Sequence, residues 1–200
     1  MTTTYDEDPG VRLMLAYQAG EESAFDRIVE TYSPQVFALF TRFLGARQNR
    51  EDLVQEVFLR VLRARGRYQP TARFSTFLFR IAFNIAVNET QRGGAKERVG
   101  FELGHDDEHG TGLALVADTN DTAPSVALEQ QDVVQAVRTA IAKLPENQRM
   151  ALILAKYDDV PYAEIAVVLG TSEKAVKSLV HRAREALREM LEPFLQGELA

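Results

Sequence analysis

The middle of the chain constrains the fold more than any other feature. Residues 93–127 hold six glycines, seven carboxylates and only two Lys or Arg residues, and their apolar residues follow no period. Such a stretch cannot bury enough apolar surface to offset its chain entropy, so we expect a flexible acidic linker. A loop of this length would be unusual inside one compact domain. The 200-residue chain is therefore expected to form two small domains, residues 1–92 and 128–200, joined by the linker 93–127.

Both flanking regions have the apolar periodicity of helices, and no strand pattern stands out. The sequence predicts an all-α fold of two small helical domains. Pro34 is expected to break one helix near Tyr32, Asn49 and Ser75 are expected to cap the helices that follow them, and Gly93 with Gly94 is expected to end the helix before the linker. The predicted helices are 11–19, 22–44, 50–64, 75–92, 128–143, 145–157, 162–169 and 173–192, the last ended by Pro193.

Composition excludes several classes of protein. No run of 18 apolar residues is present, and the polar, acidic first ten residues do not resemble a signal peptide, so we expect a cytoplasmic protein without membrane insertion. The chain has no cysteine and a net charge of −6. The negative sum does not exclude nucleic-acid binding, because the arginines gather away from the acidic segments.

No enzyme signature is apparent. The sequence contains no phosphate-binding loop, no dinucleotide-binding glycine pattern and no suggestion of a catalytic triad, so we predict no catalytic residue and no cofactor. The run from His105 to His109 contains possible metal ligands, but it lies in the glycine-rich linker without a scaffold to fix their geometry. We therefore predict no metal site.

The most specific motif lies near the C-terminus. Ala166 is small where two helices would cross, Gly170 can adopt the left-handed turn, and Val176 returns to a shared core. These offsets are typical of a helix-turn-helix, which predicts that the C-terminal domain contains one.

The last predicted helix has an apolar stripe and a polar, basic side. Short polar and basic side chains near the start of such a helix suit base edges and phosphates in the major groove. The alternative is an ordinary amphipathic helix with a solvated basic face. The candidate DNA-binding residues are Ser172, Glu173, Lys174, Lys177, Ser178, His181 and Arg182.

The N-terminal half has two further candidate surfaces. In the helix 50–64, Asp52, Gln55, Glu56 and Leu59 form a stripe that could dock a partner helix or could simply be solvated. The helix 75–92 combines aromatic, amide and arginine side chains, which is what recognition of single-stranded DNA requires. An aromatic-rich core helix with a polar outside is an equally open alternative. Its candidate residues are Phe77, Arg80, Phe83, Asn84, Asn88 and Arg92.

Together, five segments in this order resemble the sigma-70 superfamily of bacterial RNA polymerase sigma factors, and specifically its extracytoplasmic-function (ECF) group. The segments that carry the resemblance are DLVQEVF at 52–58, FSTFLFRIAFN at 74–84, LPENQR at 144–149, YAEIA at 162–166 and VKSLVHRAR at 176–184.

The resemblance implies a transcription initiation factor whose parts have separate roles. Residues 52, 55, 56 and 59 would dock on the coiled coil of the largest subunit of the RNA polymerase core. The helix 75–92 would read and melt the −10 promoter element, with Asn84 at the family's asparagine, and the helix from Glu173 would read the −35 element. The partners implied are core polymerase, including its flap region, promoter DNA and an anti-sigma factor. Because polymerase must hold the two readers apart, the free chain is expected to bind promoters poorly.

Four positions depart from the common pattern of the group. Phe77 stands where tryptophan is usual, Phe83 where arginine is frequent, Asn88 where aspartate is usual and Leu179 where arginine is often found. The family's promoter preferences are therefore not transferred to this chain.

Two alternatives explain part of the pattern. A helix-turn-helix regulator that binds operators alone would account for the C-terminal half but leaves the 75–92 helix without a role. An adaptor or antagonist would bind polymerase without initiating transcription. A test with core polymerase separates both from an initiation factor.

Overall fold

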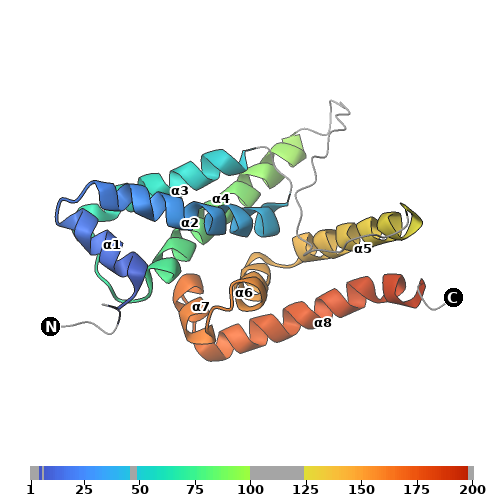
Figure 1. The fold of residues 1–200 in the computed structure, drawn as a ribbon. Helices are drawn as coiled ribbons and strands as arrows, with labels where there is room; N and C mark the ends of the chain where they lie inside the picture. Colours follow the sequence, from blue (N-terminus) through green and yellow to red (C-terminus); the bar gives the residue numbers. More distant parts are fainter. Residues whose placement is uncertain (1–4, 6, 46–48, 100–123, 198–200) are drawn as a thin grey trace.

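The computed structural model describes residues 5, 7–45, 49–99 and 124–197, and in these ranges the chain is helical with no strand (Figure 1). The predicted all-α class is confirmed. The α-helices are α1 (Pro9–Gln18), α2 (Ser23–Leu44), α3 (Arg50–Ala64), α4 (Phe74–Val99), α5 (Pro124–Lys143), α6 (Glu146–Tyr157), α7 (Tyr162–Leu169) and α8 (Glu173–Gly197), with a 3-10 turn η1 (Arg65–Arg67) after α3.

Several predicted helix boundaries are wrong. α2 runs unbroken through Pro34, which lies inside the helix, and Ser33 donates its hydroxyl hydrogen to the carbonyl of Val29 one turn earlier. Buried residues on both sides of Pro34, Tyr32 and Val36 among them, hold the two halves of α2 on the same core. Packing along the helix therefore outweighs the loss of one backbone hydrogen bond at proline.

The predicted caps are also corrected. Asn49 precedes α3 but makes no capping hydrogen bond, and its amide donates to Glu89 at 3.0 Å instead. α4 begins at Phe74, so Ser75 lies within its first turn rather than capping it. The backbone N–H of Phe77 donates to the carbonyl of Arg73 at 3.2 Å, which makes Arg73 the N-cap residue.

Both ends of the predicted linker are helical. α4 continues through Gly93 and Gly94 to Val99, and α5 begins at Pro124, ahead of the predicted start. The remaining residues 100–123, which include His105 to His109, lie outside the described residues. At the other end of the chain α8 passes Pro193 and ends at Gly197, and nothing in its described contacts explains why this proline does not end it.

The N-terminal domain consists of α1 to α4 around an aromatic-rich core. Asp8 caps α1 by accepting the N–H of Val11 at 2.8 Å, and Pro9 occupies the first turn, where its missing N–H costs nothing. Gly10 lies against the start of α4, where an added Cβ would come within 2.7 Å of Phe74 Cβ. Phe74 is itself fully buried. Glycine thus permits the close approach of α1 to the first turn of α4.

The C-terminal domain consists of α5 to α8. Gly170 ends α7 in the left-handed conformation (φ 62°), and the next N–H, of Thr171, returns to the carbonyl of Ala166 at 2.9 Å. This is the closure expected when glycine ends a helix. Ile165, Ala166 and Val176 are all buried between the helices. The predicted helix-turn-helix is therefore present as α7–turn–α8.

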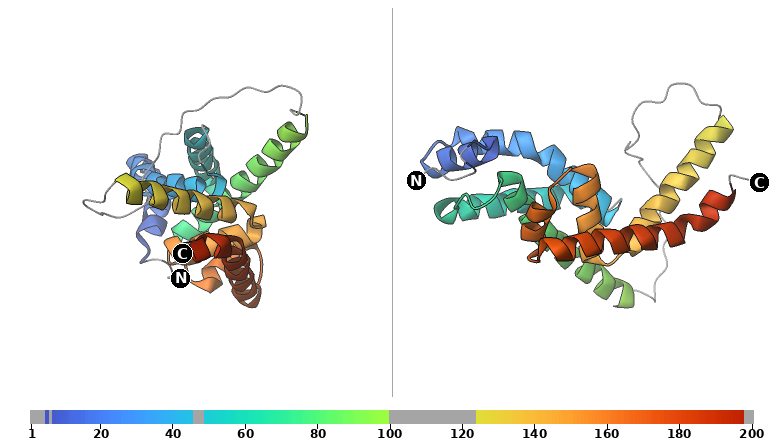
Figure 2. Two further views of the ribbon diagram at one scale, coloured as in Figure 1. Left: turned by 90° about the vertical axis from the view of Figure 1, so that its right-hand side faces the viewer. Right: turned by 90° about the horizontal axis from the view of Figure 1, so that it is seen from below.

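The two domains are packed together rather than apart. α6 and α7 lie between the N-terminal helices and α8, as Figure 1 and the two further views of Figure 2 show. α7 packs against α4, and α2 contacts both α5 and α6. The buried apolar residues of both domains form one connected cluster. This close packing was not predicted from the sequence.

Among the described residues, no helix is long and apolar enough to cross a membrane. The same part of the chain contains no group of three or more His, Cys, Asp or Glu side chains placed to hold a metal ion.

Candidate nucleic-acid and partner interfaces

The stripe predicted to dock a partner lies on the outward side of α3. Asp52 and Gln55 are exposed, while Val57 and Val61 on the opposite side of α3 are fully buried in the domain core. Glu56 accepts a hydrogen bond from Arg60 Nε at 2.8 Å, and this contact lowers the pKa of its carboxyl. α3 thus presents carboxylates on its outward side.

The same side of α3 carries an apolar pair. Leu59 is 46% exposed, and Leu62, one turn further on, is 43% exposed. Leu62 was not among the predicted residues, because the apolar period of this helix predicts that Leu62 belongs to the core face. Only its observed exposure separates it from buried neighbours such as Val61. Two adjacent exposed leucines beside carboxylates are typical of a protein-binding surface.

On α4, the polar candidates are accessible and the aromatic ones are not. Arg80, Asn84, Asn88 and Arg92 are exposed. Phe77 is half-buried and packs edge-on to Tyr68, with ring centroids 5.1 Å apart. The structure therefore brings the amides and arginines together on the surface but holds Phe77 against the core.

Phe83 does not fit its predicted role in this arrangement. It is 8% exposed and packs edge-on to Phe43 at 6.2 Å between centroids. Seven-residue spacing places it on the same side of α4 as Thr76 and Thr90, and both of these hydroxyls contact carboxylates of the C-terminal domain. A base could reach Phe83 only after the surrounding side chains had moved.

At the start of α8 all the candidate residues are exposed. Ser172 Oγ accepts the N–H of Ala175 at 3.2 Å and so caps α8. Two of the basic side chains are paired along the helix, Lys177 with Glu173 at 3.1 Å and His181 with Glu185 at 3.0 Å. The exposed candidates are Ser172, Glu173, Lys174, Lys177, Ser178, His181 and Arg182.

A carboxylate of the helix-turn-helix reaches the first turn of α4. Thr76 Oγ1 donates to Glu164 Oε2 at 2.6 Å, and Arg73 Nε lies 3.1 Å from Glu164 Oε1. Thr76 is completely buried, and the Glu164 side chain is 16% exposed. Because α4 begins at Phe74, the carboxylate also lies close to the positive end of the helix dipole. Neither Thr76 nor Glu164 was among the predicted site residues.

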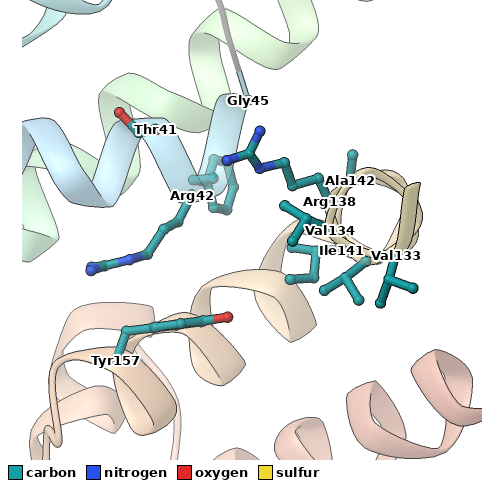
Figure 3. A pocket seen from close by; sticks show the side chains of 11 residues that line it. Thr41, Arg42, Gly45, Val133, Val134, Arg138, Ile141, Ala142 and Tyr157 are labelled. Carbon is teal, nitrogen blue, oxygen red and sulfur yellow. The ribbon is translucent and has the colours of Figure 1, made fainter. Parts of the chain in front are cut away.

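A second contact joins the end of α6 to α2. Arg42 Nη1 lies 3.6 Å from Asp158 Oδ1, and its guanidinium stacks over the Tyr157 ring at 4.8 Å. Burial raises the pKa of the Asp158 carboxyl above its ordinary value, although Arg42 opposes this shift. Beside them, Val134 and Ile141 of α5 line an apolar pocket of 220 Å³ with the end of α2 (Figure 3).

Arg149 lies where helices from the two domains end. Its Nη1 donates to the carbonyl of Phe43 in α2 at 3.0 Å, and its Nη2 donates to Leu144 at 2.9 Å and also to Ala142. The guanidinium also lies over the Phe43 ring at 4.9 Å. A cation is favourable at this position because the C-terminal ends of helices carry partial negative charge.

Comparisons with known proteins match both halves of the chain. The chain matches the family model for Sigma-70 region 2 over residues 28–95 and that for Sigma-70, region 4 over residues 134–187. It is 31% identical over 185 residues to an RNA polymerase sigma-H factor of Pseudomonas aeruginosa, covering 92% of this chain and 95% of the relative. It is 30% identical over 188 residues to the ECF RNA polymerase sigma-E factor of Escherichia coli, covering 90% and 92%.

Solved structures share the fold. CnrH, in complex with the cytosolic domain of CnrY, superposes with a TM-score of 0.63 at 23% identity, covering 91% of this chain and 96% of that one. The sigma factor RpoE of Bartonella quintana, in complex with the anti-sigma factor NepR, superposes with a TM-score of 0.63 at 20% identity, covering 84% and 96%. On the sequence matches to both of its regions, the chain belongs to the sigma-70 family and, within it, to the ECF RNA polymerase sigma factors, which are transcription initiation factors.

Proposed function

We propose that the outward side of α3 docks this factor on core polymerase. Asp52, Gln55 and Glu56 would supply polar contacts to the coiled coil of the largest subunit, and Leu59 with Leu62 would supply apolar area. This exposed leucine pair is the observation that carries the proposal. Exposed apolar patches mark contacts with other proteins, and core polymerase is the protein that an initiation factor must bind.

The second part of the proposal concerns α4 and the −10 element. Asn84 and Asn88 would contact bases, and Arg80 and Arg92 would hold phosphates, because all four are exposed on this helix. Phe77 would stack on a base at the edge of this surface. Phe83 would join them only after a rearrangement, since it is buried beside Phe43.

The third part concerns α8 and the −35 element. The N-terminal turns of α8 would enter the major groove with Lys177, Ser178, His181 and Arg182 toward the DNA. The cap residue Ser172 and the neighbouring Lys174 would contact the backbone. Glu173 would keep Lys177 oriented and could accept a hydrogen bond from a cytosine amino group.

The remaining partners follow from the same role. The C-terminal domain would contact the flap region of polymerase, and an anti-sigma factor would hold the free protein, as the complexes of CnrH with CnrY and of RpoE with NepR suggest. The factor would act in the cytoplasm, where polymerase and chromosome are. It would act by binding, without catalysis or a cofactor.

Run-off transcription tests the proposal directly. Core polymerase is supplied with a library of promoter fragments from the source organism, with and without the full chain. We expect discrete new transcripts that disappear with Asn84→Ala, and that weaken with Lys177→Ala at promoters needing a −35 element. Glu189→Gln, an exposed change on α8 outside the candidate sites, serves as the control.

Two outcomes would contradict the proposal. Tight binding to core polymerase without any transcript would identify an adaptor or antagonist. Operator binding by a chain with no affinity for polymerase would identify a lone regulator. Leu59→Asp and Leu62→Asp separate these cases, because they should abolish core binding while leaving the distant helix-turn-helix intact.

A further inference from the structure

Besides the shared apolar cluster, two polar contacts between the domains lie far apart along α4. Glu164 contacts Thr76 in its first turn, and Glu146 at the start of α6 accepts a hydrogen bond from Thr90. Fourteen residues separate the two threonines, which corresponds to roughly 21 Å along a helix. The C-terminal domain is thus fixed along one side of the helix assigned to the −10 element.

Glu164 makes two of the polar contacts across this interface. Its carboxylate is the partner of a completely buried hydroxyl, that of Thr76, and of the N-cap residue Arg73. Removing the carboxylate while the domains stay together would leave a buried polar group without its acceptor. If the domains separate, water can satisfy both groups. The contact therefore favours the packed state without preventing its opening.

The packed state cannot read two promoter elements at once. α7 lies against both α4 and α8, and packed helices have axes roughly 8–10 Å apart, so the two reading helices are about 20 Å apart at α7. Elements two turns of DNA apart are separated by roughly 70 Å. The two domains must therefore separate before both elements are bound.

We propose that Glu164 is an intramolecular latch, which closes the free chain by holding the helix-turn-helix on the first turn of α4 through Thr76 and Arg73. The latch keeps the −10 and −35 readers together until polymerase binding provides enough free energy to part the domains. This inference rests on the proposed roles of α4 and α8. It assigns a regulatory function to a residue outside every DNA- and polymerase-contacting surface described above.

Single-molecule Förster resonance energy transfer between two dyes on the full chain measures the fraction of molecules in the closed state. The chain has no cysteine, so Glu30→Cys on α2 and Val167→Cys on α7 provide two unique labelling sites, both exposed in the closed form. We expect high transfer in the free protein and low transfer once core polymerase is added. Glu164→Ala, which removes the acceptor, should increase the ratio of open to closed molecules roughly tenfold, while Glu189→Ala leaves it unchanged.

Thr76→Val keeps the shape of the buried side chain and removes the hydroxyl. If the two residues act as one latch, the double variant should open no further than the more open single variant. Far-UV circular dichroism of each variant shows whether the helices remain folded. Equal effects of Glu164→Ala and Glu189→Ala, or full additivity of Glu164→Ala with Thr76→Val, would overturn the proposal.

The same labelled protein separates this inference from the proposed function. Low transfer in the free wild type, together with normal run-off transcription, would reject the latch and leave the initiation factor intact. High transfer in the free protein without any binding to core polymerase would reject the proposed function instead.

Discussion

The two helices proposed to read DNA differ in how they present their side chains. On α8 all the candidate residues are exposed, and within the described residues its main contacts are with α5, α6 and α7 of its own domain. On α4 the amides and arginines are exposed, but Phe77 is half-buried, Phe83 is buried, and α7 covers part of the helix. The proposed −35 reader, α8, is therefore accessible in the free protein, whereas α4, the proposed −10 reader, also contributes side chains to the core and to the interdomain interface.

The proposed roles of the two helices would account for this difference. A major-groove reader binds an intact duplex and can be rigid and exposed. A reader of melted DNA needs aromatic surface, which is costly to leave in water until a base is available to stack on it. Burial of Phe83 in the free protein avoids that cost.

Phe83→Ala should lower the free energy of unfolding by about 3–5 kcal/mol, because it removes a buried ring packed on Phe43. Asn84→Ala, its exposed neighbour, should change stability by about 0.5 kcal/mol or less while abolishing transcription. Urea titration followed by circular dichroism measures both. Unchanged stability in Phe83→Ala would mean that this ring is free for DNA and that α4 is as exposed as α8.

Gly10→Ala should destabilise the protein by about 1–3 kcal/mol, because the added methyl would meet Phe74 at the start of α4. Gly66→Ala is the matched control, since nothing lies within 4 Å of a Cβ at that position. Thermal melts of the two variants give the difference. Equal melting temperatures would show that the start of α4 does not depend on α1.

Lys177→Ala should weaken the binding of holoenzyme to a −35-containing promoter by about 1–2 kcal/mol. It should also lower the magnitude of the slope of log K against log salt concentration by about one, because one phosphate contact is lost. The reason is that Lys177 is exposed on the reading side of α8. Lys156→Ala, an exposed lysine on α6, is the control. An identical salt slope in both variants would remove Lys177 from the DNA interface.

Asp158→Asn should have the smallest effect on the free energy of unfolding, and the size of this effect should depend on pH. Since burial raises the pKa of Asp158, the folded protein binds its proton more tightly than the unfolded chain, so this group stabilises the fold at low pH. That stabilisation is lost as the pH rises through the raised pKa. The variant should match the wild type near pH 3 and be more stable by less than about 1 kcal/mol at pH 7. A less stable variant at pH 7 would show that the pair with Arg42 outweighs burial.

Elements marked by local signals could be predicted from the sequence. Gly170 at the end of α7 and the apolar period of α3 both act within a few residues, and the structure has these two helices where they were expected. The same rules were wrong where packing along a helix outweighed them. Pro34 lies between buried turns of α2, and α4 passes Gly93 and Gly94 without ending.

The candidate surfaces were only partly predictable for the same reason. Helical spacing assigned the polar side of α4 correctly, because amides and arginines avoid the core. Helical spacing could not distinguish an exposed phenylalanine from a buried one, so Phe83 was predicted to contact DNA although it is buried. For the same reason the exposure of Leu62 was not predicted. The contact of Glu164 with Thr76 spans 88 residues of sequence, and no local pattern contains that information.

The position of Arg149 determines what can move when the domains part. Of its carbonyl partners, Ala142 and Leu144 belong to the corner between α5 and α6, whereas Phe43 belongs to the other domain. Separation would cost the arginine its hydrogen bond to Phe43 and its stacking on that ring, while its bonds within the α5–α6 corner remain. The C-terminal domain would then leave as a rigid body with its own geometry intact, so the −35 reader would arrive at DNA already assembled rather than refolding there.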